Sequence, residues 1–160
     1  MSPTSDGFKI ALNLDQLAKD RLVFGPIWLE VDSTNFPGFG WTDFPVAILG
    51  FWLVNIQPLL LGRVEACECP FMDGPYNFRL EVSGRSKWKL SMFDHSALKE
   101  DPVGIKILAS RAVLNQLITT AEILLQKCEE KNWLDRDAAA LTDSLVQVKT
   151  IVEALPSYSE

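Results

Sequence analysis

Residues 36–61, FPGFGWTDFPVAILGFWLVNIQPLLL, contain the most apolar segment of the chain together with the loop that leads into it. The loop is rich in glycine and aromatic residues, whereas residues 44–61 carry no charged side chain. A helix that is apolar on nearly every side belongs inside a protein, so we predict a buried helix here. Pro58 must end or kink this helix, and Gly62 closes the segment.

Three residues mark the expected start of this helix. Thr42 fits the N-cap position, and Asp43 suits the positively charged first turn. Pro45 is tolerated there because its missing N–H would have no partner in the first turn. We therefore expect the loop to end at Thr42 and the helix to follow directly.

Residues 44–61 are also long enough to be considered as a membrane span. Asn55, Gln57 and Pro58 interrupt the apolar run, and no cluster of Lys or Arg flanks it to set an orientation. We therefore interpret the segment as a core helix and predict no contact with a membrane.

Alternation of apolar and polar residues predicts strands before and after this helix. The clearest pair is a hairpin in which Tyr76, Phe78, Leu80 and Val82 are followed, after a Gly84-Arg85 turn, by an alternating second strand. Shorter alternating runs predict further strands at residues 8–14, 27–31, 64–68 and 103–108.

The last third of the chain has helical periodicity. Apolar residues recur every three or four positions over residues 113–128 and again over residues 141–155, with Asp135 as a good N-cap between them. The short link predicts an antiparallel helix pair. The expected fold is therefore α+β, one domain over residues 1–160, with an antiparallel sheet of four to six strands packed on the buried helix and a C-terminal two-helix hairpin. Residues 1–6 are expected to be a disordered tail.

Composition narrows the classes of function. The chain has 160 residues, of which 48% are hydrophobic and 22% charged, as in ordinary globular proteins. Its net charge is −6 and its pI is about 4.8. This charge disfavours nucleic acids and anionic membranes, which are bound by clustered Lys and Arg, and it favours a basic protein partner.

The cysteines indicate a reducing compartment. Cys67, Cys69 and Cys128 are odd in number, and the first residues lack the basic and apolar regions of a secretory signal, so we predict a cytoplasmic protein. Cys67 and Cys69 lie on one side of an expected strand, but a tetrahedral metal site needs four ligands and His95 is the only histidine. We expect small buried thiols and no metal site.

No pattern typical of an active site is present. The chain has no GxSxG elbow, no phosphate-binding loop and no dinucleotide fingerprint. His95 is the only histidine available as a general base, and its polar neighbours indicate a surface residue. We predict no catalytic residue and no cofactor, and interpret the chain as a binding protein.

The candidate partner-binding residues lie in three segments: Phe39, Trp41 and Asp43; Asp73; and Glu129 and Glu130. The loop aromatics could fill the core instead, or offer an apolar anchor to a partner. Asp43 is explained by the helix start, and Asp73 by the MDGP turn or by contact with a basic partner. The two glutamates could form an ordinary solvated face.

Several motifs together resemble a known group of proteins. They are WTDFPVAILGFWL at residues 41–53, PFMDGPYNFRLE at residues 70–81, the hairpin Trp88, and LLQKC followed by NWL between residues 124 and 134. The pattern resembles small bacterial immunity-type proteins of polymorphic-toxin and contact-dependent-inhibition loci, over about residues 36–133. The resemblance implies a stoichiometric inhibitor without turnover or cofactor, which binds a cognate toxin in the cytoplasm of the producing cell.

Two other functions stay open at this point. The chain could be a small-molecule-binding or regulatory module with a pocket between the sheet and the helix at residues 44–54, or an enzyme that uses His95. Under any of these functions, the C-terminal helix hairpin could also form a homodimer.

Overall fold

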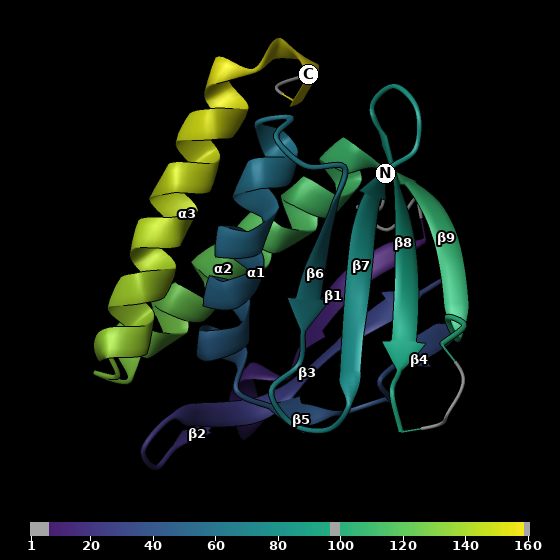
Figure 1. Ribbon diagram of the computed structural model, residues 1–160. Helices are drawn as coiled ribbons and strands as arrows, with labels where there is room; N and C mark the ends of the chain where they lie inside the picture. The colour runs from purple at the N-terminus through teal and green to yellow at the C-terminus, as the bar shows by residue number, and fades with distance from the viewer. Residues whose placement is uncertain (1–6, 97–99, 159–160) are drawn as a thin grey trace.

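The computed structural model describes residues 7–96 and 100–158 (Figure 1). Within them the chain forms two antiparallel sheets and a group of α-helices, with a helix pair at the C-terminal end. The predicted α+β class is therefore confirmed. The strands are divided between two sheets, a division that alternation along single strands does not reveal. The predicted tail at residues 1–6 lies outside the described residues.

The N-terminal sheet is built around one long strand. Strand β3 (Val23–Val31) pairs antiparallel with β1 (Phe8–Leu12), β2 (Ala18–Lys19), β4 (Thr34–Phe36) and β5 (Thr42–Asp43). A single 3-10 turn, η1 (Leu14–Gln16), connects β1 to β2. Alternate residues of β3, among them Ile27 and Leu29, point into the core and are fully buried.

The second sheet is a meander with the strand order β6-β7-β8-β9. Its strands are β6 (Ala66–Pro70), β7 (Tyr76–Val82), β8 (Lys87–Asp94) and β9 (Gly104–Ala109). The predicted hairpin is β7–β8, with Val82 opposite Trp88 next to the turn. One face of this sheet packs on the core through Phe78, Leu80 and Leu90, which are fully buried.

Helix α1 (Pro45–Leu60) packs against β3, β6 and both C-terminal helices. Trp52 is fully buried in it and donates its indole N–H to the carbonyl oxygen of Pro70 at 2.6 Å. The rings of Phe71 and Phe78 meet Trp52 edge to face, with centroids 5.4 and 4.9 Å away. These contacts join the helix to the second sheet.

The start of α1 differs from the prediction. Thr42 is not the N-cap, because Thr42 and Asp43 form β5 and pair with Gly25 and Pro26 of β3. Phe44 is the N-cap and makes no side-chain cap hydrogen bond. The backbone of Thr42 and Asp43 pairs with a distant strand, so these residues do not form the helix start that their local sequence predicted.

Helix α1 is also less enclosed than its composition suggests. Ten of its residues are buried, but Phe51 and Val54 have exposed side chains. Figure 1 shows why: α3 lies on one side of α1 and β6 on the other, and α2 lies behind it, so that one side of the helix is left free.

Helices α2 (Ser110–Glu130) and α3 (Arg136–Ala154) form the predicted C-terminal pair, and a short 3-10 turn, η2 (Pro156–Tyr158), follows. Asp135 is the N-cap of α3 and accepts a hydrogen bond from the Ala138 N–H at 3.0 Å, as predicted. Lys19 of β2 lies 3.3 Å from the Asp135 carboxylate and ties the helix pair to the N-terminal sheet. In the described part of the chain, every helix is too short or too polar to cross a bilayer.

Candidate functional site

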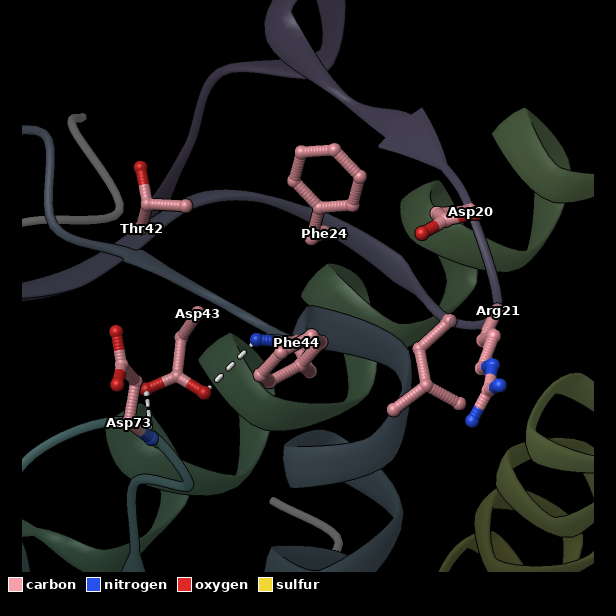
Figure 2. Close-up of a pocket in the computed structure, with 8 residues that line it drawn as sticks. Asp20, Arg21, Phe24, Thr42, Asp43, Phe44 and Asp73 are labelled. Atoms are coloured by element: carbon pink, nitrogen blue, oxygen red, sulfur yellow. Dashed lines mark hydrogen bonds between the residues drawn. The ribbon is translucent and has the colours of Figure 1, made fainter.

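Three of the residues proposed from the sequence, Trp41, Asp43 and Asp73, come together where β5, the start of α1 and the turn between β6 and β7 meet. The organising residue is Asp43, whose side chain is only 1% exposed. Its Oδ1 accepts hydrogen bonds from the backbone N–H groups of Phe44 at 2.8 Å and Met72 at 3.2 Å. Its Oδ2 accepts from the indole N–H of Trp41 at 3.0 Å. The same oxygen accepts from the backbone N–H of Asp73 at 3.1 Å, and Figure 2 shows this bond.

This geometry corrects the role expected for Asp43. A carboxylate that is buried and accepts four hydrogen bonds is not available to a partner. It instead fixes the 36–41 loop, through Trp41, to the turn that carries Asp73. The sequence made both Asp43 and Asp73 candidate partner-binding residues. It did not indicate that they are in contact, because they are 30 residues apart.

Aromatic packing holds the loop on its inner side. Phe36 is buried, and its ring meets Phe71 and Tyr76 edge to face. Trp41 meets Tyr76 in the same way, with ring centroids 5.1 Å apart. The backbone is fixed as well, since the Trp41 carbonyl accepts a 2.7 Å hydrogen bond from the Ile27 N–H. Phe36 and Trp41 therefore belong to the packed part of the loop.

Phe39 is the loop aromatic that remains accessible. Its side chain is 77% exposed, and its ring rests edge to face on Trp28 of β3, with centroids 5.1 Å apart. Trp28 itself is buried, and among the described residues its indole N–H has no hydrogen-bond partner. Of the two roles open to the loop aromatics, Phe36 fills the core and Phe39 faces solvent.

A groove of about 440 Å³ lies beside Asp43 at the same end of the molecule. Figure 2 shows Asp20 and Asp73 on opposite sides of the rings of Phe24 and Phe44. The groove therefore has an aromatic centre between two exposed carboxylates. Its full lining is Asp20, Arg21, Leu22, Phe24, Thr42, Asp43, Phe44 and Asp73.

This groove is not the pocket that the small-molecule alternative expected between the sheet and the helix at residues 44–54. There, Ile48, Leu49 and Trp52 are fully buried. The groove lies at the end of the helix and is formed largely by the β2–β3 hairpin and by residues 42–44, and the β6–β7 turn contributes Asp73.

Glu129 and Glu130 are exposed at the C-terminal end of α2 and do not line the groove. The ion pair between Lys19 and Asp135 links the α2–α3 connection to β2. The residues that directly follow β2 line the groove. Figure 1 places β2 and this connection at the same end of the molecule. The two glutamates are therefore peripheral to the site.

Sequence reasoning missed a polar cluster on the outer face of the second sheet. Glu68 accepts hydrogen bonds from the Asn77 amide at 2.6 Å and from the Arg79 Nε at 2.5 Å. His95 Nε2 is hydrogen-bonded to the Asn77 Oδ1, and its ring stacks on Phe93. Strand register, which opposes Glu68 to Arg79, was the missing signal. The hydrogen bonds of Glu68 and Asn77 are made within the cluster, which indicates a structural network.

The three cysteine side chains are packed in the interior of the protein. All three are buried free thiols. A hydrogen bond from Cys69 lowers the pKa of Cys67, whereas burial raises the pKa of Cys69 well above its ordinary value. Burial also raises the pKa of Cys128 to about 11. Over residues 7–96 and 100–158, no group of three His, Cys, Asp or Glu side chains is arranged to hold a metal ion.

Comparisons of the chain with protein-family models, with curated proteins and with solved structures give no significant match.

Proposed function

We propose that this protein is a non-catalytic binding protein of the immunity type, which neutralises a cognate bacterial toxin in the cytoplasm by forming a stoichiometric complex. The observation that carries the proposal is Phe39, a large apolar side chain that is 77% exposed on a loop anchored from within. Exposed aromatic residues of this kind dominate the binding energy of protein interfaces.

Preorganisation makes Phe39 a better anchor than an aromatic residue on a free loop. Binding costs about 0.5–1.5 kcal/mol for each side chain that must be immobilised, and more when a loop must be ordered. Trp28 supports the Phe39 ring from below, and the four hydrogen bonds of Asp43 hold the loop that carries it. Much of the ordering cost is therefore met in the unbound protein.

Charge supports a basic partner. The net charge is −6, and Asp20 and Asp73 are exposed on opposite sides of the groove. Complementary charge accelerates association and disfavours wrong partners. A toxin that acts on nucleic acid carries the basic surface that such a protein would recognise.

The direct test is co-expression with the product of a neighbouring gene that is toxic when it is expressed alone. The proposal expects rescue of growth and a one-to-one complex on co-purification. Phe39→Ala should weaken the complex by about 2–4 kcal/mol, or about 30- to 1000-fold in Kd, as is typical of an anchor residue. Ile105→Ala is the matched control, because Ile105 is also exposed but lies on β9.

Two results would remove the proposal. One is the absence of both rescue and co-purification with the neighbouring toxin. The other is a complex in which Phe39→Ala and Ile105→Ala have the same small effect, because the 36–41 loop would then lie outside the interface.

The groove favours a second candidate function, a small-molecule-binding or regulatory module. Its volume of about 440 Å³ and its aromatic lining suit a small apolar ligand. A thermal-shift screen with apolar carboxamides and amines tests this alternative. A ligand that raises Tm for the wild type but not for Phe24→Ala would favour it over toxin binding.

A further inference from the structure

The free side of α1 carries an exposed apolar stripe. Phe51 is 47% exposed, Val54 52% and Leu61, which directly follows the helix, 43%. Val54 follows Phe51 by three residues and Leu61 follows Val54 by seven, so the three side chains lie on one side of the helix. The rest of α1 is largely core. Large contiguous apolar patches on a protein surface commonly mark interaction sites.

Polar side chains beside the stripe are hydrogen-bonded to neighbouring elements. Asn55 donates to the backbone carbonyl of Glu68 in β6 at 3.0 Å. Gln57 donates to the side chain of Gln147 in α3 at 3.0 Å. These bonds hold α1 between its two neighbours, and the residues left on the free side are apolar.

The stripe is aligned along the helix with the groove, and the half-buried Ala47 lies between Phe51 and the groove residue Phe44. Phe44, which lines the groove, precedes Phe51 by seven residues and therefore lies on the same side, two helical turns away. From Phe44 to Leu61 the surface is about 26 Å long at 1.5 Å per residue. This length matches a helix of about five turns.

The charges near this surface are mainly acidic. Asp20 and Asp73 lie at the groove, Asp143 lies one turn before Gln147 on α3, and Glu65 follows α1. These four acids are exposed, and in the described residues none of their side chains forms an ion pair. Two exposed bases, Arg21 and Arg63, lie in the same region, which leaves an excess of negative charge.

We propose that the stripe and the groove together bind an amphipathic α-helix of the partner, with an apolar face of about five turns flanked by Lys or Arg. The apolar face would cover Phe51 and Val54, and the flanking cations would meet Asp73 and Asp143. Such helix-in-groove recognition uses anchors at positions i, i+3, i+4 and i+7. This inference rests on the proposed function, because it describes which part of a protein partner is recognised.

A synthetic peptide tests the inference without the toxin. The probe is a fluorescein-labelled 18-residue helical peptide with leucine along one stripe and lysine on both flanks. Its affinity is measured by fluorescence anisotropy for the wild type, Val54→Asp and Val103→Asp. The two valines are both exposed, but Val103 lies beside β9, so its substitution controls for the added charge.

We expect Val54→Asp to raise Kd at least tenfold and Val103→Asp less than twofold. A peptide with glutamate in place of lysine should bind at least tenfold more weakly than the probe. Val54→Ser is a milder second variant and should raise Kd by at least threefold. Urea unfolding of each variant establishes that the helix is intact.

Three results would overturn the inference. The first is equal loss of binding in Val54→Asp and Val103→Asp, and the second is no measurable binding of the lysine peptide. The third is a concentration-dependent dimer, seen by light scattering and abolished by Val54→Asp, which would assign the stripe to a second copy of the chain. If the peptide fails while a neighbouring toxin is still neutralised through Phe39, only this inference falls. If the peptide binds but no toxin is neutralised, the proposed function falls instead.

Discussion

Replacing Asp43 with asparagine should destabilise the protein although the two side chains have nearly the same shape. In the native protein the carboxylate accepts two hydrogen bonds at each oxygen. An asparagine whose oxygen keeps Phe44 and Met72 would point its NH₂ group at the N–H groups of Trp41 and Asp73. Donor would then face donor, and two hydrogen bonds would be lost.

The magnitude follows from these two bonds. Hydrogen bonds to a charged group contribute about 1.5–3 kcal/mol each, and the exposed position of Asp73 allows water to replace part of one. We therefore expect Asp43→Asn to lower the free energy of unfolding by about 3 kcal/mol. With a urea m-value of about 2 kcal/mol/M, the midpoint would fall by about 1.5 M.

Urea unfolding followed by tryptophan fluorescence measures this change. Asp73→Asn is the control, because Asp73 contributes its backbone N–H to the network while its side chain is exposed, and it should alter stability by less than about 0.5 kcal/mol. An effect of Asp43→Asn below 1 kcal/mol, or equal to that of Asp73→Asn, would refute the view that this carboxylate holds the loop.

Two further predictions concern titratable groups. Partial burial raises the pKa of Asp135, but hydrogen bonds from the Ala138 N–H and the Lys19 ammonium have the larger combined effect and lower the pKa below 3.8. The Asp135 carboxylate therefore stabilises the fold above pH 3.8. This contribution is lost as the pH falls further. Asp135→Asn, which keeps the cap, should therefore cost about 1 kcal/mol at pH 7 and progressively less as the pH falls below 3.8 in urea titrations; an equal cost at pH 7 and pH 2 would be contrary evidence. Cys128, whose pKa burial raises to about 11, should resist iodoacetamide at pH 8 until urea unfolds the chain, as mass spectrometry of the labelled peptides would show.

Local patterns predicted the elements whose signals are complete within a few residues. Alternation located the β7–β8 hairpin, and the side chain of Asp135 caps α3 through the residue three positions later. Both depend on neighbours in the sequence, so tertiary contacts did not need to be known. The same applies to the apolar stripes that place α2 and α3 together.

Features set by distant contacts could not be predicted in this way. Thr42 has good N-cap chemistry, but pairing with Pro26 places it in a strand. The burial of Asp43 depends on a turn about 30 residues away. The apolar run at residues 44–61 correctly indicated a helix that is mostly buried. It did not indicate which side of the helix is exposed, because the positions of α3 and β6 decide that Val54 faces solvent.

The 36–43 segment departs from the rules of a stable monomer at two positions, and the departures complement each other. Burying the Asp43 carboxylate costs desolvation energy, which its four hydrogen bonds must offset before any stability is gained. Exposing Phe39 forgoes about 1.5–3 kcal/mol that burying such a ring would contribute. A chain under selection for stability alone has simpler solutions at both positions. Local rules are broken together mainly at functional sites, and here the buried charge fixes the loop on which the exposed ring stands. This coupling is why we propose that the loop binds the partner, and the proposal predicts that Asp43→Asn should weaken the complex although its carboxylate is buried beneath the loop.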